Sequence, residues 1–192
     1  AEQTKFLKIL NKENCDLVHF PHFNLPILYR KPYIVTIHDL TLSFFPGHKM
    51  TKWFHRLAYH LVIRNAAKKS AHIITVSNNT KNDIIEQLKV SPSKISVIHN
   101  GVSPEFTLLR DTKAIVKSLQ KYGISKSFLL YTGVWRSHKN LVRLIAAFEI
   151  LKNKRNLDID LVITGKADPH YPEVKSAIKR HNLSASVITP GL

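Results

Sequence analysis

The stretch that decides the fold is YIVTIHD at residues 33–39, in which five apolar or β-branched residues lead into a histidine and an aspartate. A short, uninterrupted apolar run of this kind is typical of a buried β-strand in a sheet covered on both faces. Six further runs share this character and lie at residues 16–20, 72–76, 95–98, 128–132, 159–163 and 187–188. The chain therefore offers a series of buried strands.

Helical patterns separate most of these strands. Apolar residues recur at i+3 and i+4 spacing, or turn signals frame a helix, in residues 2–12, 50–69, 79–89, 112–122, 140–152 and 171–182. In the longest pattern, the large side chains Trp53, Phe54, Leu57 and Leu61 share one side, and we expect that side to pack against a sheet. Strands that alternate with helices predict an α/β protein with parallel sheets covered by helices.

An irregular stretch at residues 101–111 divides the chain. It follows the turn pair Asn100-Gly101 and contains Pro104. We expect two partial parallel α/β domains, at residues 1–108 and 109–192. Each is expected to be partial because a doubly wound domain usually has about five or six strands.

Composition narrows the possible partners and compartment. The chain has 29 Lys and Arg against 13 Asp and Glu, a formal net charge of +16. Such a field attracts phosphates of nucleic acid, lipid headgroups or nucleotide substrates, although a Lys-rich proteome would give the same surplus. One cysteine, Cys15, excludes a disulfide framework. No run reaches the roughly 20 apolar residues of a membrane span, and Glu2, Lys5 and Lys8 interrupt any signal peptide. These features predict a cytoplasmic protein.

Part of the positive charge is concentrated where acidic residues are missing. No Asp or Glu occurs from Leu40 to Asn82. Basic residues follow i+4 steps through this window and suggest one stripe along the helix: Lys52, Arg56, His60, Arg64 and Lys68. The stripe is either a solvated helix face or a contact for an anionic membrane surface.

The strongest candidate site follows the strand at 128–132. The loop from Gly133 to Asn140 carries Arg136 and Lys139 and leads into a helix. Free N–H groups at a helix start, together with two cations, favour an anion such as a diphosphate. The alternative is an ordinary basic loop capped by Asn140. The loop does not have the G-x-x-x-x-G-K-[ST] spacing of a Walker phosphate-binding loop.

Other polar residues also follow strands. His38, beside Asp39, follows the strand at 33–37. An imidazole at this place either faces a ligand or forms a structural hydrogen bond with a neighbouring loop. Asn100-Gly101 is read as a turn. His19 and His22 lack an acidic partner, so we expect no metal site.

Taken in order, these segments resemble the family 4 glycosyltransferases, also called group 1, of the GT-B fold. The matching pieces are DLVH at 16–19, VTIHD at 35–39, ITVS at 74–77, VIHNGV at 97–102, LYTG at 130–133, HKNL at 138–141, LVITG at 161–165 and VITPG at 187–191. The resemblance implies two Rossmann-like domains and transfer of a sugar from a nucleotide-sugar, GDP-mannose or a UDP-sugar, with retention of configuration. The implied acceptor is a polysaccharide or a lipid-linked glycan, as in lipopolysaccharide assembly.

The resemblance also assigns residues. It gives His38 a catalytic place at the donor sugar, and Gly133 and Lys139 the donor diphosphate. The family arginine that follows this glycine is replaced by Val134, so Arg136 is the nearest guanidinium. Gly191 corresponds to the nucleobase pocket. No metal or other cofactor is implied.

Two family features are not found in the sequence. The N-terminal strand with its glycine loop would precede Ala1, and the paired-glutamate motif would follow Leu192. We therefore expect an internal piece that is inactive by itself, from an enzyme that is cytoplasmic or peripheral at the inner face of the membrane. The alternative from charge alone is a basic nucleic-acid-binding α/β module. A nicotinamide oxidoreductase is not indicated, because no G-x-G-x-x-G follows a strand.

Overall fold

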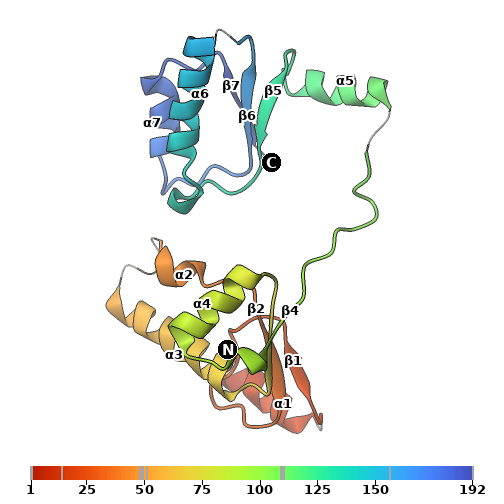
Figure 1. Ribbon diagram of the computed structural model, residues 1–192, viewed down its shortest axis with the longest axis vertical. Coiled ribbons are helices and arrows are strands. Elements are labelled where there is room, and N and C mark those ends of the chain that lie inside the picture. Colours follow the sequence, from red (N-terminus) through yellow and green to blue (C-terminus); the bar gives the residue numbers. More distant parts are fainter. Residues whose placement is uncertain are drawn as a thin grey trace. The chain divides into compact units, whose positions relative to one another are not determined.

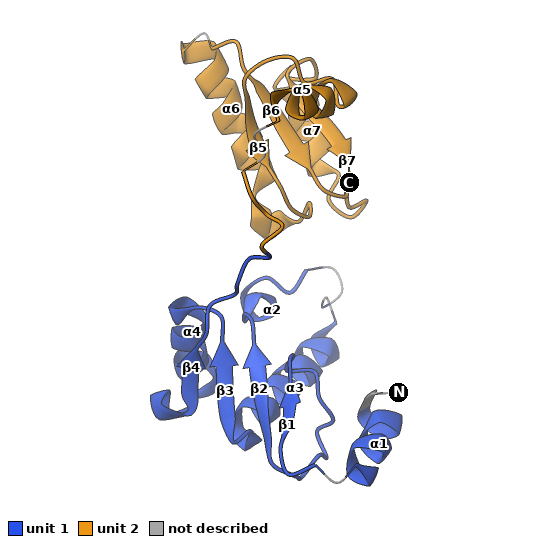
Figure 2. Cartoon of the chain, turned by 90° about the vertical axis from the view of Figure 1, so that its right-hand side faces the viewer, with its two compact units in different colours: residues 1–103 blue, residues 104–192 orange. Residues whose placement is uncertain are grey.

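The computed structural model describes residues 2–13, 15–47, 50, 52–108, 111–155 and 157–191. The chain forms two compact units, residues 1–103 and 104–192, shown in separate colours in Figure 2. The division at 108/109 that the sequence suggested falls in the same connecting segment, a few residues into the second unit. Each unit has its own parallel sheet, as the alternating pattern predicted.

The first unit contains a four-stranded parallel sheet in the order β1-β2-β3-β4. Its strands are β1 (Val18–Phe20), β2 (Tyr33–Ile37), β3 (His72–Thr75) and β4 (Ile95–Val97). Its helices are η1 (Glu2–Phe6), α1 (Leu7–Lys12), α2 (Thr41–Phe44), α3 (Trp53–Lys69), α4 (Asn78–Leu88) and η3 (Pro92–Lys94). The short helix α2 had no sequence signal, whereas the strands agree closely with the apolar runs.

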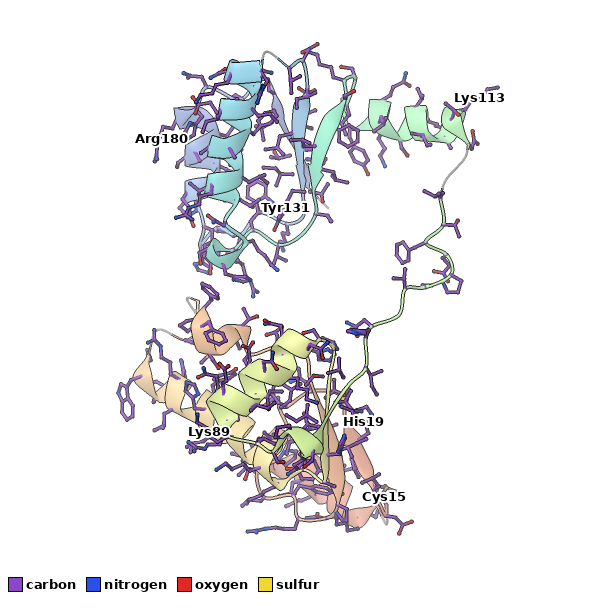
Figure 3. All side chains as sticks on the ribbon, in the orientation of Figure 1. Cys15, His19, Lys89, Lys113, Tyr131 and Arg180 are labelled. Atoms are coloured by element: carbon purple, nitrogen blue, oxygen red, sulfur yellow. The ribbon has the colours of Figure 1, made fainter. Side chains whose placement is uncertain are left out.

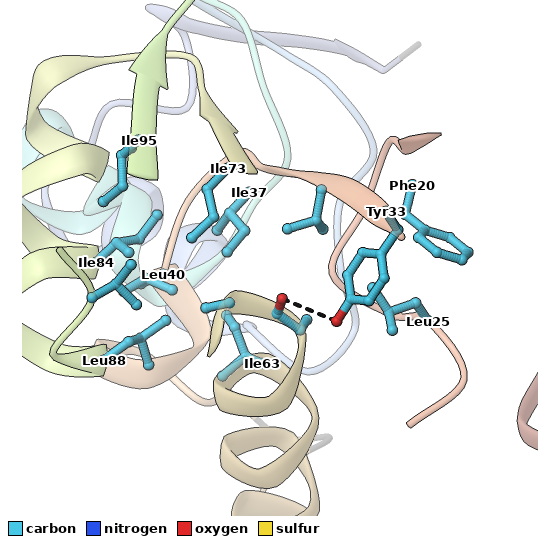
Figure 4. Close-up of a cluster of buried hydrophobic side chains, with 14 of the residues drawn as sticks. Phe20, Leu25, Tyr33, Ile37, Leu40, Ile63, Ile73, Ile84, Leu88 and Ile95 are labelled. Atoms are coloured by element: carbon cyan, nitrogen blue, oxygen red, sulfur yellow. Dashed lines mark hydrogen bonds between the residues drawn. The ribbon is translucent and has the colours of Figure 1, made fainter. Parts of the chain in front are cut away.

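The core of this unit lies between the sheet and helices α3 and α4 (Figure 4). Val35 and Ile37 of β2 and Ile73 of β3 are fully buried, and Ile63 of α3 and Ile84 of α4 are buried in the same cluster. β-Branched side chains fill this layer because they fit a pleated surface that is covered by helices.

Helix α3 packs through a different side from the one expected. Its buried residues are Tyr59, Ile63, Ala66 and Ala67, which lie three or four residues apart along one side of the helix. The expected set, Trp53, Phe54, Leu57 and Leu61, is exposed instead. Small alanines let the helix approach the sheet closely, so the side with the smaller residues forms the core contact.

The second unit contains a three-stranded parallel sheet in the order β5-β6-β7. Its strands are β5 (Phe128–Tyr131), β6 (Asp160–Thr164) and β7 (Val187–Gly191). Its helices are α5 (Thr112–Lys121), η4 (Ser137–Lys139), α6 (Leu141–Arg155) and α7 (Glu173–Arg180). Figure 1 shows α6 and α7 on the same side of this sheet.

That side holds the second core, in which Leu161 and Ile163 of β6 are buried in one cluster with Ile145 and Phe148 of α6 and Ala177 of α7. The opposite face is less covered than the sequence suggested. Among the described residues, Leu130 of β5 remains 61% exposed and lines a cavity. Helix α5 borders this cavity, so it covers the face only in part.

None of the helices in the described ranges is both long enough and apolar enough to cross a bilayer.

Candidate functional site

Three glycines meet where the strands of the second sheet end. Gly133 follows β5, Gly165 follows β6, and Gly191 ends β7. The Gly165 N–H donates to the Gly191 carbonyl at 2.9 Å. A Cβ at Gly165 would lie 2.0 Å from the Gly133 carbonyl oxygen, and the φ of +101° also favours glycine. The ends of β5 and β6 therefore lie directly against each other, and only glycine fits at residue 165.

A cavity of about 790 Å³ opens beside these glycines. Its walls come from α5, from the face of β5 and β6, and from the segments that end the three strands. The lining residues are Ser118, Leu119, Tyr122, Ile124, Phe128, Leu130, Thr132, Gly133, Val134, Val162, Thr164, Gly165, Lys166, Pro190 and Gly191. Gly133 and Gly191, which the sequence analysis assigned to the diphosphate and the nucleobase, therefore lie on one cavity.

The basic loop after β5 is anchored by Trp135. This side chain is 3% exposed, and its Nε1–H donates to the Thr164 carbonyl at 3.4 Å. Nearby, the Tyr131 hydroxyl donates to the Val134 carbonyl at 3.3 Å, and burial raises the pKa of this phenol. Figure 3 locates Tyr131 on β5. The loop is therefore fixed to β5 and β6 directly after Gly133.

The two cations of this loop point away from the core. Arg136 and Lys139 are exposed, and within the described parts of the chain neither side chain has a hydrogen-bond or ion-pair partner. Asn140, with φ +56°, begins α6 through its carbonyl, which accepts the N–H groups of Arg143 and Leu144. The amide side chain expected to cap the helix is not what starts it.

Arg136 and Lys139 lie on the same loop as Gly133, but they do not line the cavity. Gly133 and Gly191 thus lie on one cavity, whereas the charges of Arg136 and Lys139 lie outside it on the adjoining loop. Full positive charges near a helix start suit an anionic group.

His38 lies at the carboxyl end of the first sheet. Its side chain is exposed, and Nε2 is 3.0 Å from the Pro21 carbonyl. A carbonyl only accepts, so Nε2 carries the proton and Nδ1 remains available. The backbone is held as well, because the Thr80 hydroxyl donates to the His38 carbonyl at 3.0 Å. His38 therefore has a fixed position and one ring nitrogen free to meet a ligand.

The neighbour of His38 has a structural role. The Asp39 carboxylate accepts the Thr41 N–H at 2.9 Å, at the start of α2. Asn100-Gly101 forms no turn and lies outside helix and strand, contrary to the turn expected there. An Asn-Gly pair indicates a tight turn where it joins the two strands of a hairpin. Here the pair follows β4 and leads towards the second unit, so no hairpin is formed.

The histidines considered as metal ligands have other partners. His19 Nε2 is 2.8 Å from the Thr36 hydroxyl, and His22 Nδ1 accepts the Asn24 N–H at 3.1 Å. No cluster of three or more His, Cys, Asp or Glu side chains occurs in the portion of the chain that the structure describes.

Thr164, Gly165 and Lys166 were missed as site residues by the sequence reasoning. The available signal was that a glycine lies at or just after the end of each strand of this sheet, β6 included. The contact between Gly165 and Gly133 has no signal in the sequence, because it depends on how the two strand ends approach.

Comparison with known proteins identifies the family. Residues 1–106 match the model of Glycosyltransferase Family 4. The O-antigen chain mannosyltransferase RfbU of Salmonella typhimurium is 25% identical over 163 residues, which cover 84% of this chain and 40% of RfbU. The UDP-Gal:alpha-D-GlcNAc-diphosphoundecaprenol alpha-1,3-galactosyltransferase of Escherichia coli is 30% identical over 172 residues, covering 84% of this chain and 43% of that enzyme.

Solved structures share the fold. The crystal structure of Anabaena Alr3699/HepE in complex with UDP-glucose superposes with a TM-score of 0.75 at 18% identity, covering 98% of this chain and 50% of that one. The structure of WaaG, a glycosyltransferase involved in lipopolysaccharide biosynthesis, gives 0.68 at 15% identity, covering 97% and 51%. The chain spans less than half the length of the curated relatives it matches. With a family model matched over more than half of its residues, the chain belongs to glycosyltransferase family 4.

Proposed function

We propose that this chain supplies the donor-binding loop and part of the acceptor-side domain of a retaining glycosyltransferase. The donor is a nucleotide-sugar, GDP-mannose or a UDP-sugar, and the acceptor is a polysaccharide or a lipid-linked glycan. The observation that carries the proposal is the loop from Gly133 to Lys139. It presents two exposed cations, which have no ion-pair partner among the described residues, beside the glycines that follow the strands of a parallel sheet.

The charges suit the chemistry of the donor. When the glycosidic bond to the donor breaks, negative charge develops on the departing nucleoside diphosphate. Cations and N–H groups already in position stabilise that charge as it forms. Lys139 and Arg136 supply the cations, and the start of α6 supplies the N–H groups. In this proposal no metal ion is needed for departure.

The remaining assignments follow from position. Gly133 and Gly191 line one cavity, where the diphosphate and the base are proposed to bind side by side. His38 is proposed to act on the donor sugar through its free Nδ1. The names of the relatives support the sugar class, because one is a mannosyltransferase and another a galactosyltransferase with a UDP-Gal donor.

Calorimetry with UDP and GDP tests the loop directly. Lys139→Ala should weaken nucleoside diphosphate binding by roughly 10- to 150-fold, the equivalent of one charge-assisted hydrogen bond of about 1.5–3 kcal/mol. Lys154→Ala is a matched control, because Lys154 is an exposed lysine in the last turn of the same helix that Lys139 precedes. Equal affinities for Lys139→Ala and Lys154→Ala would refute the assignment.

Arg136→Ala answers a separate question. If Arg136 replaces the family arginine missing at Val134, its loss should weaken binding as Lys139→Ala does. An unchanged affinity for Arg136→Ala would leave Lys139 as the cation that binds the diphosphate.

The nucleic-acid-binding alternative is not favoured. The matched family model and the curated relatives are glycosyltransferases. Matched salt titrations with DNA and with UDP would separate general phosphate attraction from a built nucleotide site.

A further inference from the structure

Among the described residues that line the cavity of the second unit, one carries a full charge. This residue is Lys166, which follows Gly165 at the end of β6, and the other lining residues are apolar, glycine or neutral polar. Arg136 and Lys139 do not line the cavity. The positive charge on the cavity lining therefore comes from the end of β6 and not from the loop after β5.

The backbone that leads into Lys166 is held to both neighbouring strands. The Thr164 hydroxyl donates to the Tyr131 carbonyl of β5 at 3.2 Å. On the other side, the Gly165 N–H donates to the Gly191 carbonyl of β7 at 2.9 Å. The side chain of Lys166 is exposed, so its ammonium can move over the cavity while its backbone stays in place.

The ammonium of Lys166 has no hydrogen-bond or ion-pair partner within the described ranges of the chain. The carboxylate that lies two residues further on, Asp168, accepts the His170 N–H at 3.0 Å. Other lysines of this unit have partners, since Lys126 pairs with Asp158. Lys166 is therefore available to bind an anion that enters the cavity.

The cavity lining has no cation at the position where the family resemblance places one. Val134, which stands in the place of that arginine, lines the cavity and is 48% exposed. Val134 directly follows Gly133, and Lys166 directly follows Gly165. The backbones of these two glycines approach closely. A cation at residue 134 and a cation at residue 166 would therefore start from adjoining strand ends beside the same cavity.

We propose that Lys166 binds the diphosphate of the donor nucleotide from the cavity side, as a substitute for the arginine missing at Val134. This inference rests on the proposed function of the site. Phosphate oxygens accept hydrogen bonds from the Lys166 ammonium, which is a compact charge with three donors. The mainly apolar walls of the cavity keep part of the water away, which strengthens the attraction between opposite charges.

Variants of graded charge at residue 166 test the proposal by calorimetry with UDP and with GDP. Lys166→Arg should keep the affinity of the wild type. Lys166→Met keeps a long apolar side chain but removes the charge, so it should weaken binding about tenfold or more. Lys166→Glu should weaken binding further, because a carboxylate repels the diphosphate. A lysine that only covers apolar surface with its stem would instead leave Lys166→Met equal to the wild type.

A second substitution tests whether residues 134 and 166 serve the same phosphates. Adding Val134→Arg to Lys166→Met should restore much of the lost affinity, because the charge returns from the adjoining strand end. Val134→Leu in the same background is the matched control, since it changes the size of the side chain without adding charge. It should restore nothing.

Two further controls separate the local charge from other effects. Lys175→Met removes an exposed lysine of α7 that does not line the cavity, and it should bind as the wild type does. At 1 M salt the Debye length falls to about 3 Å, so the differences among the residue 166 variants should shrink. Residues 134, 166 and 175 are all exposed, and circular dichroism should show unchanged folding for every variant.

The outcomes distinguish this inference from the proposed function. If Lys166→Met binds as the wild type does while Lys139→Ala binds weakly, the inference is overturned and the proposed function stands. Equal weakening by Lys166→Arg, Lys166→Met and Lys166→Glu would also overturn it, because the effect would then not depend on charge. A wild-type chain that binds neither UDP nor GDP would overturn both.

Discussion

The contact between Gly165 and Gly133 gives a sharp test of how the donor edge is built. Gly165→Ala introduces a Cβ that would lie 2.0 Å from the Gly133 carbonyl oxygen and 2.9 Å from its carbonyl carbon. Both atoms belong to backbone, so no flexible side chain can move aside. The loop after β5 has to shift away from the end of β6.

The expected loss of stability has two parts. An L-residue forced to positive φ costs about 1–2 kcal/mol, and overpacking against neighbouring atoms costs about 1–3 kcal/mol more. Gly165→Ala should thus lower the free energy of unfolding of the second unit by about 2–5 kcal/mol. Gly191→Ala is the matched control: its φ is +87°, and no atom lies within 4 Å of its added Cβ. Gly191→Ala should lower the free energy of unfolding only by the cost of the positive φ, about 1–2 kcal/mol.

Urea unfolding followed by the fluorescence of Trp135 measures this difference. Trp53→Phe leaves Trp135 as the only tryptophan, and its bond to the Thr164 carbonyl places it next to Gly165. The free energies come from linear extrapolation in urea. Equal losses for Gly165→Ala and Gly191→Ala would refute the close approach of the two strand ends, because then the conformational cost alone would account for both.

Three further predictions concern the first unit. Burial raises the pKa of Tyr33 from 10.0 to about 12, so this tyrosine ionises first in unfolded chains. Its contribution to stability is constant below pH 10 and should be lost as the pH rises towards 12; Tyr33→Phe should reduce the loss of stability over this range in urea titrations, and an identical loss would contradict the assignment. The Ser77 hydroxyl caps α4, and Ser77→Ala should cost about 0.5–2 kcal/mol by thermal unfolding, whereas an unchanged melting temperature would argue against the cap. Ile63→Ala should cost about 2–5 kcal/mol, while Leu61→Ala on the exposed side should cost far less, and the reverse order would restore the original orientation of α3.

Much of the fold was predictable because local sequence determines it. The run at 33–37 coincides with β2, and the pattern at 112–122 coincides with α5 to within a residue. Buried strands reveal themselves through continuous β-branched sequence, and their alternation with helices limits the topology to parallel sheets. The division into two units followed from the irregular stretch around Pro104.

The orientation of α3 was not predictable by the same means. Its sequence offers two apolar sides, one with Trp53 and Leu57 and one with Ile63 and Ala66, and periodicity alone does not say which side meets the sheet. The prediction placed the side with the larger residues, Trp53 and Leu57, against the sheet. In the structure, the side with Ile63 and Ala66 packs there instead. The carboxyl-edge glycines are a similar case, because each is visible in the sequence but their mutual approach is a property of tertiary structure.

The two separate cores have a consequence for how the molecule can be divided. No residue is shared between the cluster around Ile63 and the cluster around Ile145. The described residues of the connection, including Val102 and Phe106, are exposed and lie outside helix and strand. A protease should cut there first, and the two products should each keep their own sheet. The cavity of about 790 Å³ lies wholly within the second product, so that half alone retains the groups assigned to the nucleotide.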